Sequence, residues 1–347
     1  MSQVSRSMGL PRLVLGLTVL AALVVGACQG AASQAPEGDY ELHMRMTPSN
    51  VAWVVAQEEG LFEGIDLDWE LVGYGESAQL FVAGTDPVGQ ESPWEAARFQ
   101  SEGDNIAYFG TAGALNFFNG VIVRTEDADK YQEVPDLVGQ KFGIPGFGSG
   151  TYQAFEILAN ATWDINARED FELIEADPGA LVGLLETGEI DAMINFTGQT
   201  ALAISQPDVY TIILNTSDLW KETHGANLVI NGPMARREWL DENTDVGRRL
   251  LEGVDAGMQW LKDNPEAIDN PDGKYAYITE GEGWYQTPET TELIMQMFLD
   301  GEYYFTHDLY TQEWVEGVYE FIELGKGVFA DEVPPKEDVF YLPYLQE

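Results

Sequence analysis

A glycine-rich stretch, GIPGFGSGTYQAF at residues 143–155, is the first candidate for chemistry in this chain. Its glycines alternate with other residues, at Gly146, Gly148 and Gly150, just before an aromatic-rich helical start. A phosphate-binding P-loop ends in Gly-Lys-Ser/Thr, but this turn has no lysine, and its spacing also differs from the G-x-G-x-x-G fingerprint of dinucleotide sites. The pattern therefore argues against a nucleotide site.

The same turn is suited to a different, oxygen-bearing ligand. We predict that its glycines form a tight turn between a strand and a helix, whose first N–H groups stay free to donate hydrogen bonds. Ser149 and Thr151 add hydroxyl groups, while Phe147 and Tyr152 add flat apolar faces. Carbonyl, carboxylate and sulfonate oxygens are the groups that such a turn would receive.

Three further loops place aromatic residues beside amide or hydroxyl groups. They supply nine more candidate ligand-binding residues: Ser49, Asn50 and Trp53; Gln90, Ser92 and Trp94; Asn195, Phe196 and Thr197. A single tryptophan in such a loop is more often part of the core than a ligand platform. The recurrence of the pattern in several loops nevertheless favours a binding site.

The charges near these loops decide what the ligand would be. No lysine or arginine lies within them, and the nearest cation, Arg45, could simply face solvent on the first predicted strand. Aromatic rings with amides suit a flat, neutral, hydrogen-bonding ring. Asp86 or Glu91 would instead suit a cationic amine.

Strand and helix patterns alternate along the chain around these loops. The expected strands are 40–46, 65–72, 86–89, 105–109, 120–124, 141–145, 171–176, 191–195, 209–214 and 227–230. The expected helices are 51–59, 77–82, 94–100, 152–160, 180–187 and 199–205, followed by a long helical remainder. This alternation predicts an α/β fold with parallel sheets and with ligands at the carboxyl ends of the strands.

An internal repeat divides this α/β pattern into two halves. LFVAGTDPVG at 80–89 and LLETGEIDAM at 184–193 each combine a helix end, a glycine cap, an aspartate and a strand. We predict two lobes, each a mostly parallel sheet flanked by helices, joined by the hinge strands 120–124 and 227–230. Lobe I would comprise residues 39–121 and 229–347, and lobe II residues 122–228. Two lobes joined in this way form a cleft that can close.

The N-terminus is typical of a lipoprotein signal peptide. Residues 1–27 hold two arginines, no acidic residue and an apolar run too short to span a bilayer. Small residues directly precede Cys28, the only cysteine in the sequence. We expect Cys28 to be lipidated and to anchor the chain at the outer face of the cell membrane, with 28–38 as a flexible tether. A plain secretion signal is the alternative.

The composition excludes two classes of partner. Removal of residues 1–27 leaves 15 basic against 59 acidic residues, a net charge of −44. Nucleic-acid binding requires a basic face, and charge-driven binding to anionic lipid does so too. The acidic residues are dispersed, which indicates a solubilising surface compatible with a salty medium.

Three motifs resemble the type II periplasmic solute-binding proteins of ABC importers, in particular the branch that binds sulfonates, nitrate or thiamine precursors. They are VVAQEEGLF at 54–62, DLVGQKFGIP at 136–145 and LETGEIDA at 185–192, and the lipoprotein signal supports the likeness. The resemblance covers most of the mature chain. It implies that the candidate loops face a cleft that closes over a small solute, and that the partners are a permease and its ATPase. Loops 47–50 and 87–94 depart from the family pattern, which leaves the ligand class open.

We expect a monomer that binds a flat nitrogen heterocycle, such as a pyrimidine or flavin precursor. A small anion (alkanesulfonate, taurine, nitrate or bicarbonate) is the first alternative. A ligand-sensing lipoprotein is another, and it differs only in its partner.

A pyrimidine-synthase-like enzyme is the remaining alternative, since fungal synthases share this fold but depend on cysteine and histidine. With Cys28 lipidated no thiol remains, and His43, His224 and His307 form no metal-binding pattern. Ser149 lacks the G-x-S-x-G context of a nucleophile. We therefore expect no catalytic residue, metal or cofactor.

Overall fold

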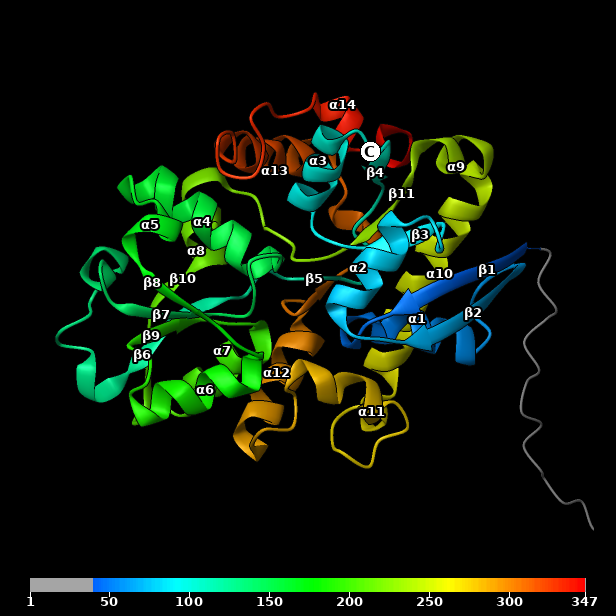
Figure 1. The fold of residues 1–347 in the computed structure, drawn as a ribbon. Helices are drawn as coiled ribbons and strands as arrows, with labels where there is room; N and C mark the ends of the chain where they lie inside the picture. The colour runs from blue at the N-terminus through cyan, green and yellow to red at the C-terminus, as the bar shows by residue number, and fades with distance from the viewer. Residues whose placement is uncertain (1–39, 347) are drawn as a thin grey trace, which may run out of the picture. The chain divides into compact units, whose positions relative to one another are not determined.

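The computed structural model describes residues 40–346, which belong to one compact unit of the chain (Figure 1). The predicted signal peptide, Cys28 and the tether lie outside these residues. Within 40–346, no helix combines the length and the apolarity that a membrane crossing requires.

A five-stranded sheet in the middle of the chain carries the glycine-rich turn. Its strands, in sheet order, are β10 (Tyr210–Asn215), β6 (Gly120–Arg124), β9 (Ala192–Ile194), β7 (Lys141–Ile144) and β8 (Glu172–Glu175). β7 is parallel to β8 and β9, while β6 is antiparallel to both β9 and β10. Four strands therefore point the same way, and β6 alone is reversed within this sheet.

Helices cover both faces of this sheet (Figure 1). They are α4 (Gly150–Trp163), α5 (Ala167–Asp170), α6 (Pro178–Thr187), α7 (Thr197–Ser205) and α8 (Thr216–His224). Side chains alternate along β6, because successive residues of a strand face opposite sides. Val121 and Val123 belong to the apolar cluster that contains Phe155 of α4, whereas Ile122 belongs to the cluster of Leu181 on α6.

The segments before and after this part of the chain together form the other half of the described structure, which has three smaller sheets. β1 (Tyr40–Met46) pairs with β2 (Ile65–Leu71) in parallel, β11 (Pro233–Arg236) lies antiparallel between β3 (Val88–Gln90) and β4 (Ile106–Tyr108), and β5 (Ala114–Leu115) pairs with β12 (Tyr304–Phe305). β11, like β6, is the reversed strand between two strands of one direction.

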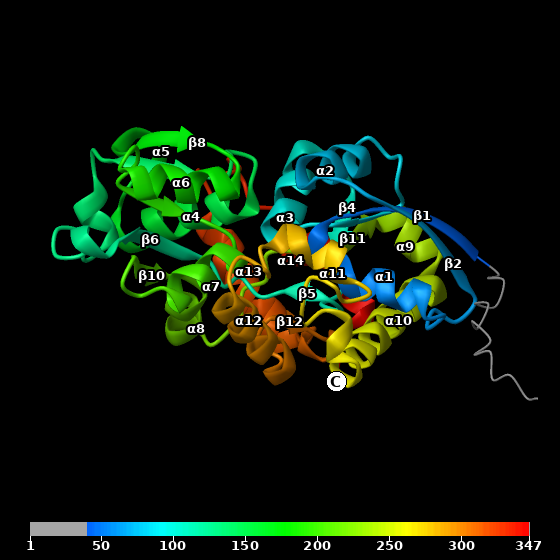
Figure 2. The same ribbon diagram turned by 90° about the horizontal axis from the view of Figure 1, so that it is seen from below.

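The helices of this half include the expected long C-terminal series. They are α1 (Val51–Glu58), α2 (Tyr74–Val82), α3 (Pro93–Glu102), α9 (Arg237–Glu242), α10 (Thr244–Asp263), α11 (Ala276–Thr279), α12 (Pro288–Asp300), α13 (Gln312–Leu324) and α14 (Lys336–Val339). α12 lies beside α7 in both views (Figures 1 and 2), and the hydroxyl oxygens of Ser205 and Thr290 are 3.0 Å apart there. The C-terminal helices thus contact the five-stranded half.

The expected strand at 227–230 is wrong in detail. Only Val229 makes a bridge, to Asn116, and flanking backbone hydrogen bonds join Phe117 N to Leu228 O and Ile230 N to Leu115 O, both 2.9 Å. The strand of the next sheet begins later, at Pro233. Residues 227–230 pair with a single neighbouring segment rather than joining a sheet, so they do not meet the pattern of a sheet strand.

The repeated Gly-Asp element has the same structural role in both halves. Gly84 and Gly188 follow α2 and α6 with left-handed φ angles of 78° and 74°, which glycine adopts without strain. Asp86 Oδ2 accepts a hydrogen bond from the backbone N–H of Arg45 on β1, and Asp191 Oδ2 accepts one from Lys141 N on β7, each at 3.1 Å. Each aspartate ties its segment to a strand of the same half, β1 or β7.

A partly buried carboxyl group, Asp255 on α10, holds the segment around His307. Both of its oxygens accept a hydrogen bond from the backbone N–H of His307, at 3.1 and 3.0 Å. Burial is the largest influence on this group and raises its pKa from 3.8 to about 7. The raised pKa means that the folded protein favours the protonated form.

We expect Asp255→Asn to raise the free energy of unfolding at pH 8 by about 1–4 kcal/mol. The native carboxyl group stabilises the fold fully below pH 4, and this contribution is lost as the pH rises through about 7. The neutral amide keeps an acceptor oxygen and does not ionise. Urea unfolding of both proteins at pH 4 and pH 8 measures the difference, and an equal gain at both pH values would contradict this account.

Candidate functional site

All four predicted loops lie where a strand passes into a helix. They stand at the N-terminal ends of α1, α3, α4 and α7, which follow β1, β3, β7 and β9. The first N–H groups of each helix have no partner within the helix. The four junctions therefore supply a set of backbone donors in addition to their side chains.

Most of the predicted side chains are buried. Ser149 and Phe196 are partly buried, and only Phe147 is exposed, at 41%. Trp53 and Tyr152 pack within apolar clusters. The remaining predicted residues are buried, and all but Trp94 are polar. Gln199, a buried glutamine that is not among the predicted site residues, lies at the same junction as Asn195 and Thr197. We call these nine residues the polar layer: Ser49, Asn50, Gln90, Ser92, Trp94, Thr151, Asn195, Thr197 and Gln199.

The glycine-rich turn and the start of α3 meet directly. A Cβ atom on Gly150 would lie 3.5 Å from Ser92 Oγ and 3.6 Å from Trp94 Nε1. Ser92 also caps α3, accepting a hydrogen bond from Glu95 N at 3.3 Å. These distances are ordinary van der Waals contacts, so the two helix ends are direct neighbours. The sequence predicted both loops, and the structure brings them together.

Asn119 links two other junctions and was missed by the sequence analysis. Its Nδ2 donates to Thr151 Oγ1 at 2.7 Å, and its Oδ1 accepts from Thr197 Oγ1 at 3.3 Å. Its backbone oxygen accepts from Thr216 Oγ1 at the start of α8, at 2.7 Å. No local pattern marks Asn119, which lies just before β6. Its position between three helix starts depends on the tertiary fold.

Asn195, in contrast, makes its hydrogen bonds locally. Its Nδ2 donates to Pro178 O at 2.9 Å, and its Oδ1 accepts from Phe196 N at 2.8 Å. The side chain therefore orders the junction between β9 and α7. This arrangement gives Asn195 a positioning role in the layer.

Glu282, also missed from the sequence, joins the start of α1 to the start of α7. Ser49 Oγ donates to Glu282 Oε1 at 2.7 Å. A Cβ atom on Gly198 would lie 1.8 Å from Glu282 O, and Gln286 Nε2 donates to Gly198 O at 3.2 Å. Segments more than 80 residues apart thus touch backbone to backbone at Gly198. Only glycine fits at this contact.

Several buried polar atoms of the layer have no hydrogen-bond partner within residues 40–346. They are both side-chain atoms of Gln90, Asn50 Nδ2, Trp94 Nε1 and Gln199 Oε1. Leaving a buried polar group unpaired costs about 1–3 kcal/mol. The set contains donors and acceptors and carries no formal charge. A bound solute with matching polar groups would remove this cost.

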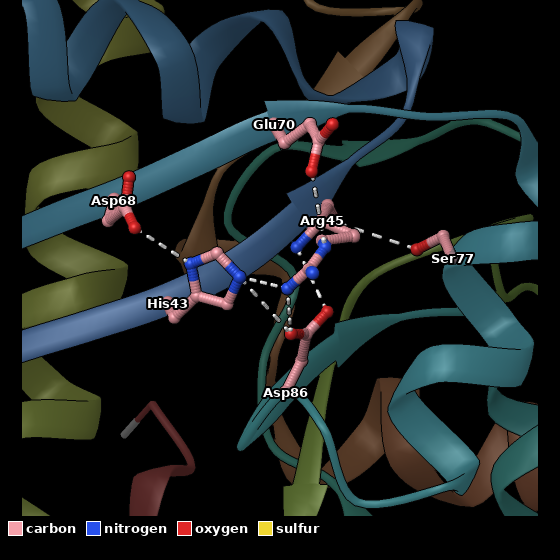
Figure 3. Close-up of polar contacts among 6 residues, drawn as sticks. All are labelled: His43, Arg45, Asp68, Glu70, Ser77 and Asp86. Atoms are coloured by element: carbon pink, nitrogen blue, oxygen red, sulfur yellow. Dashed lines mark hydrogen bonds and ion pairs between the residues drawn. The ribbon is translucent and has the colours of Figure 1, made fainter.

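Two acidic candidates for a cationic ligand have other roles. Asp86 Oδ1 lies 2.8 Å from Arg45 Nη1 and forms an ion pair with it (Figure 3). Arg45 therefore does not simply face solvent, and the charge of Asp86 is already paired. His43 contacts the same arginine and lies 3.0 Å from Asp68. Burial and then the neighbouring Glu95 raise the pKa of Glu91 well above its usual value. This shift disfavours the charged form of Glu91 and so makes it a poorer partner for an amine.

One cation near the glycine-rich turn was also missed. Arg168 on α5 lies 5.4 Å from the ring centre of Phe147 and 5.7 Å from that of Tyr152. It is bound on its other side by Glu156, with Nε–Oε1 and Nη2–Oε2 distances of 2.5 and 3.1 Å. The sequence separates Arg168 from the turn by a helix, so no motif could connect them.

The described part of the chain contains no evident metal site. Residues 40–346 contain no cluster of three or more His, Cys, Asp or Glu side chains that could hold an ion. His224 and His307 contact Glu320 and the Tyr344 carbonyl oxygen, respectively. Neither hydrogen bond involves a residue of the polar layer.

Comparison with known proteins gives a family and a fold. The sequence pattern described as NMT1/THI5 like matches residues 47–268. A search by sequence against curated proteins gives no match. The type II periplasmic-binding-protein fold is confirmed by solved structures that cover about 88% of this chain.

Three of these structures illustrate the likeness. The periplasmic aliphatic sulphonate binding protein SsuA from Escherichia coli has 15% identity and a TM-score of 0.68, over 90% of this chain and 94% of its own. SsuA from Xanthomonas axonopodis, bound to MOPS, has 13% identity and a TM-score of 0.59, over 88% and 97%. The periplasmic nitrate-binding protein NrtA from Synechocystis has 14% identity and a TM-score of 0.55, over 88% of each chain.

We expect Gly198→Ala to separate the start of α7 from the end of η5 (Glu280–Glu282), because the new methyl group would overlap Glu282 O. The free energy of unfolding should fall by about 1–3 kcal/mol. Amide hydrogen exchange should increase around Gly198 and Gln286. The matched control is Gly183→Ala on α6, where a Cβ meets nothing within 4 Å. If both variants behave alike, the backbone contact at Gly198 does not hold the segments together.

Proposed function

Because the chain belongs to the NMT1/THI5-like family, we propose that it is an extracytoplasmic solute-binding lipoprotein of an ABC importer. The two halves would close over a small solute, and the closed form would deliver it to a permease that works with an ATPase. The protein would act as a monomer. The names of the similar sulphonate- and nitrate-binding proteins support this class of function.

The observation that carries the proposal is the polar layer with its unpartnered atoms. Four helix starts from both halves of the chain converge there, and Gln90, Trp94 and Gln199 keep buried groups without partners in residues 40–346. A solute that reaches both halves stabilises the closed state, because only there are all its hydrogen bonds made. This is how a binding protein couples solute capture to a change of shape.

We favour a flat, neutral nitrogen heterocycle, such as a pyrimidine or flavin precursor, as the solute. The free groups of the layer are amides and an indole N–H, which complement a ring with its own donors and acceptors. A small anion is the second candidate, because helix N-termini donate to anions and two similar structures are named for sulphonate and nitrate.

An enzyme explains the site less well than a binding protein does. The sequence has one cysteine, at position 28, and the hydrogen bonds of His43, His224 and His307 described above go to residues outside the polar layer. A pyrimidine-synthase-like reaction would need such groups at the ligand. A sensor would use the same closure with a different partner, and interaction with a permease distinguishes the two.

We expect a thermal-shift screen with thymine, riboflavin, taurine and nitrate to show stabilisation by a ring compound. In Gln90→Leu, binding of that compound should weaken at least tenfold, while the solute-free protein should be as stable as wild type or more so. The reason is that the substitution removes two buried polar atoms that lack partners.

The matched control for Gln90→Leu is Gln100→Leu. Gln100 Nε2 donates to Ile106 O and Asp338 O, both at 2.8 Å, so this variant should lose stability and keep its affinity. Stabilisation by the two anions alone would show that the solute is an anion. Unchanged ring binding in Gln90→Leu would remove Gln90 from the site.

We expect Cys28→Ala to abolish lipid attachment, since the lipid would be carried by this thiol. The wild-type chain should incorporate labelled palmitate and sediment with membranes, and the variant should do neither. Ser33→Ala in the predicted tether is the control and should behave like wild type. Membrane association of an unlabelled Cys28→Ala chain would point to a different anchor.

A further inference from the structure

A groove of about 620 Å³ lies outside the polar layer, where the two halves of the chain face each other. One wall is made by Arg98 of α3 with Val328 and Phe329. The other wall is made by the glycine-rich turn and by α4 and α5, and it includes Phe147, Gln153 and Arg168. Its volume is in the range of small-molecule sites.

Two atoms of the groove residues lack partners within the described chain. Gln153 is 7% exposed and its Oε1 accepts no hydrogen bond, while Arg98 Nε donates none. Phe147 is 41% exposed, although phenylalanine is usually buried. The residues that carry this acceptor, this donor and this exposed aromatic ring therefore border one hollow.

Both guanidinium groups of the groove are already paired with carboxylates. Arg168 is held by both oxygens of Glu156. Arg98 Nη1 contacts both oxygens of Glu102, at 2.9 and 3.0 Å, and Arg98 Nη2 lies 3.6 Å from Glu95. Three carboxylates thus accompany two guanidinium groups. An added anion would meet a region that is already negative.

We propose that this groove binds a neutral, planar amide or imide group, as a second contact for the solute beyond the polar layer. The N–H of such a group donates to Gln153 Oε1, its carbonyl oxygen accepts from Arg98 Nε, and its flat face stacks on Phe147. This proposal rests on the proposed solute-binding function. It adds that the solute is planar and uncharged at this end. Nitrate is planar but charged, and taurine has charged groups and is not planar.

The test uses the purified mature chain and three probes. Thymine and lumichrome are neutral planar imides of two sizes, and naphthalene-1-sulfonate is a planar anion without an N–H donor. Lumichrome binding is followed by fluorescence quenching, and thymine and the sulfonate by calorimetry. We expect at least one imide to bind and the sulfonate to bind at least tenfold more weakly.

Variants locate the binding in the groove. Gln153→Leu and Phe147→Leu should each weaken imide binding at least tenfold. Gln259→Leu and Tyr277→Leu are matched controls, because Gln259 is an exposed glutamine of α10 and Tyr277 is a 52% exposed aromatic side chain; both should keep wild-type affinity. Phe147 is exposed, so its variant is informative even where Gln153→Leu loses stability.

Three results would overturn the proposal. Neither imide binds, the sulfonate binds as tightly as the imides or more tightly, or both groove variants bind the imide with wild-type affinity. A thermal-shift screen of the same protein separates these failures from failure of the proposed function. If another solute stabilises the wild-type chain and Gln90→Leu weakens it, the solute-binding function stands and only the groove assignment is lost.

Discussion

The structure depends on one constraint: helix N-termini and amide side chains are buried together where segments distant in the chain meet. Each of α1, α3, α4 and α7 brings backbone donors that its own helix does not use. Ser49, Asn119 and Glu282 join these junctions through side-chain hydrogen bonds. Buried side-chain atoms of Gln90, Trp94 and Gln199 have no partner within residues 40–346, and they give the interior a capacity for a polar solute.

Small residues make this convergence possible. Gly198 lets α7 touch the backbone of Glu282, where the Cβ of any other residue would overlap Glu282 O. Gly150 lies beside Ser92 and Trp94 and is most tightly packed against Ile230, 3.3 Å from where a Cβ would stand. The glycine-rich turn is therefore in direct contact with the start of α3.

The strongly acidic composition does not extend unchanged into the site. The few cations are held by neighbouring carboxylates: Arg45 by Asp86, Arg168 by Glu156, and Arg98 by Glu102. Pairing fixes the positions of these side chains and removes their availability as free anion receptors. The polar layer itself relies on amides, hydroxyls and an indole, which favours recognition by hydrogen bonding over recognition by net charge.

The sequence by itself determined the alternation of the main strands and helices between residues 40 and 214, the four strand-to-helix junctions and the fold class. These follow from local periodicity, glycine caps and the repeated Gly-Asp element, all encoded within a few neighbouring residues. The tertiary structure alone decided that 227–230 pairs with 115–117, that Asp86 holds Arg45, and that Asn119, Glu282 and Arg168 join the predicted loops. Contacts between residues tens to hundreds of positions apart leave no local pattern, because they arise only when separate elements pack against one another.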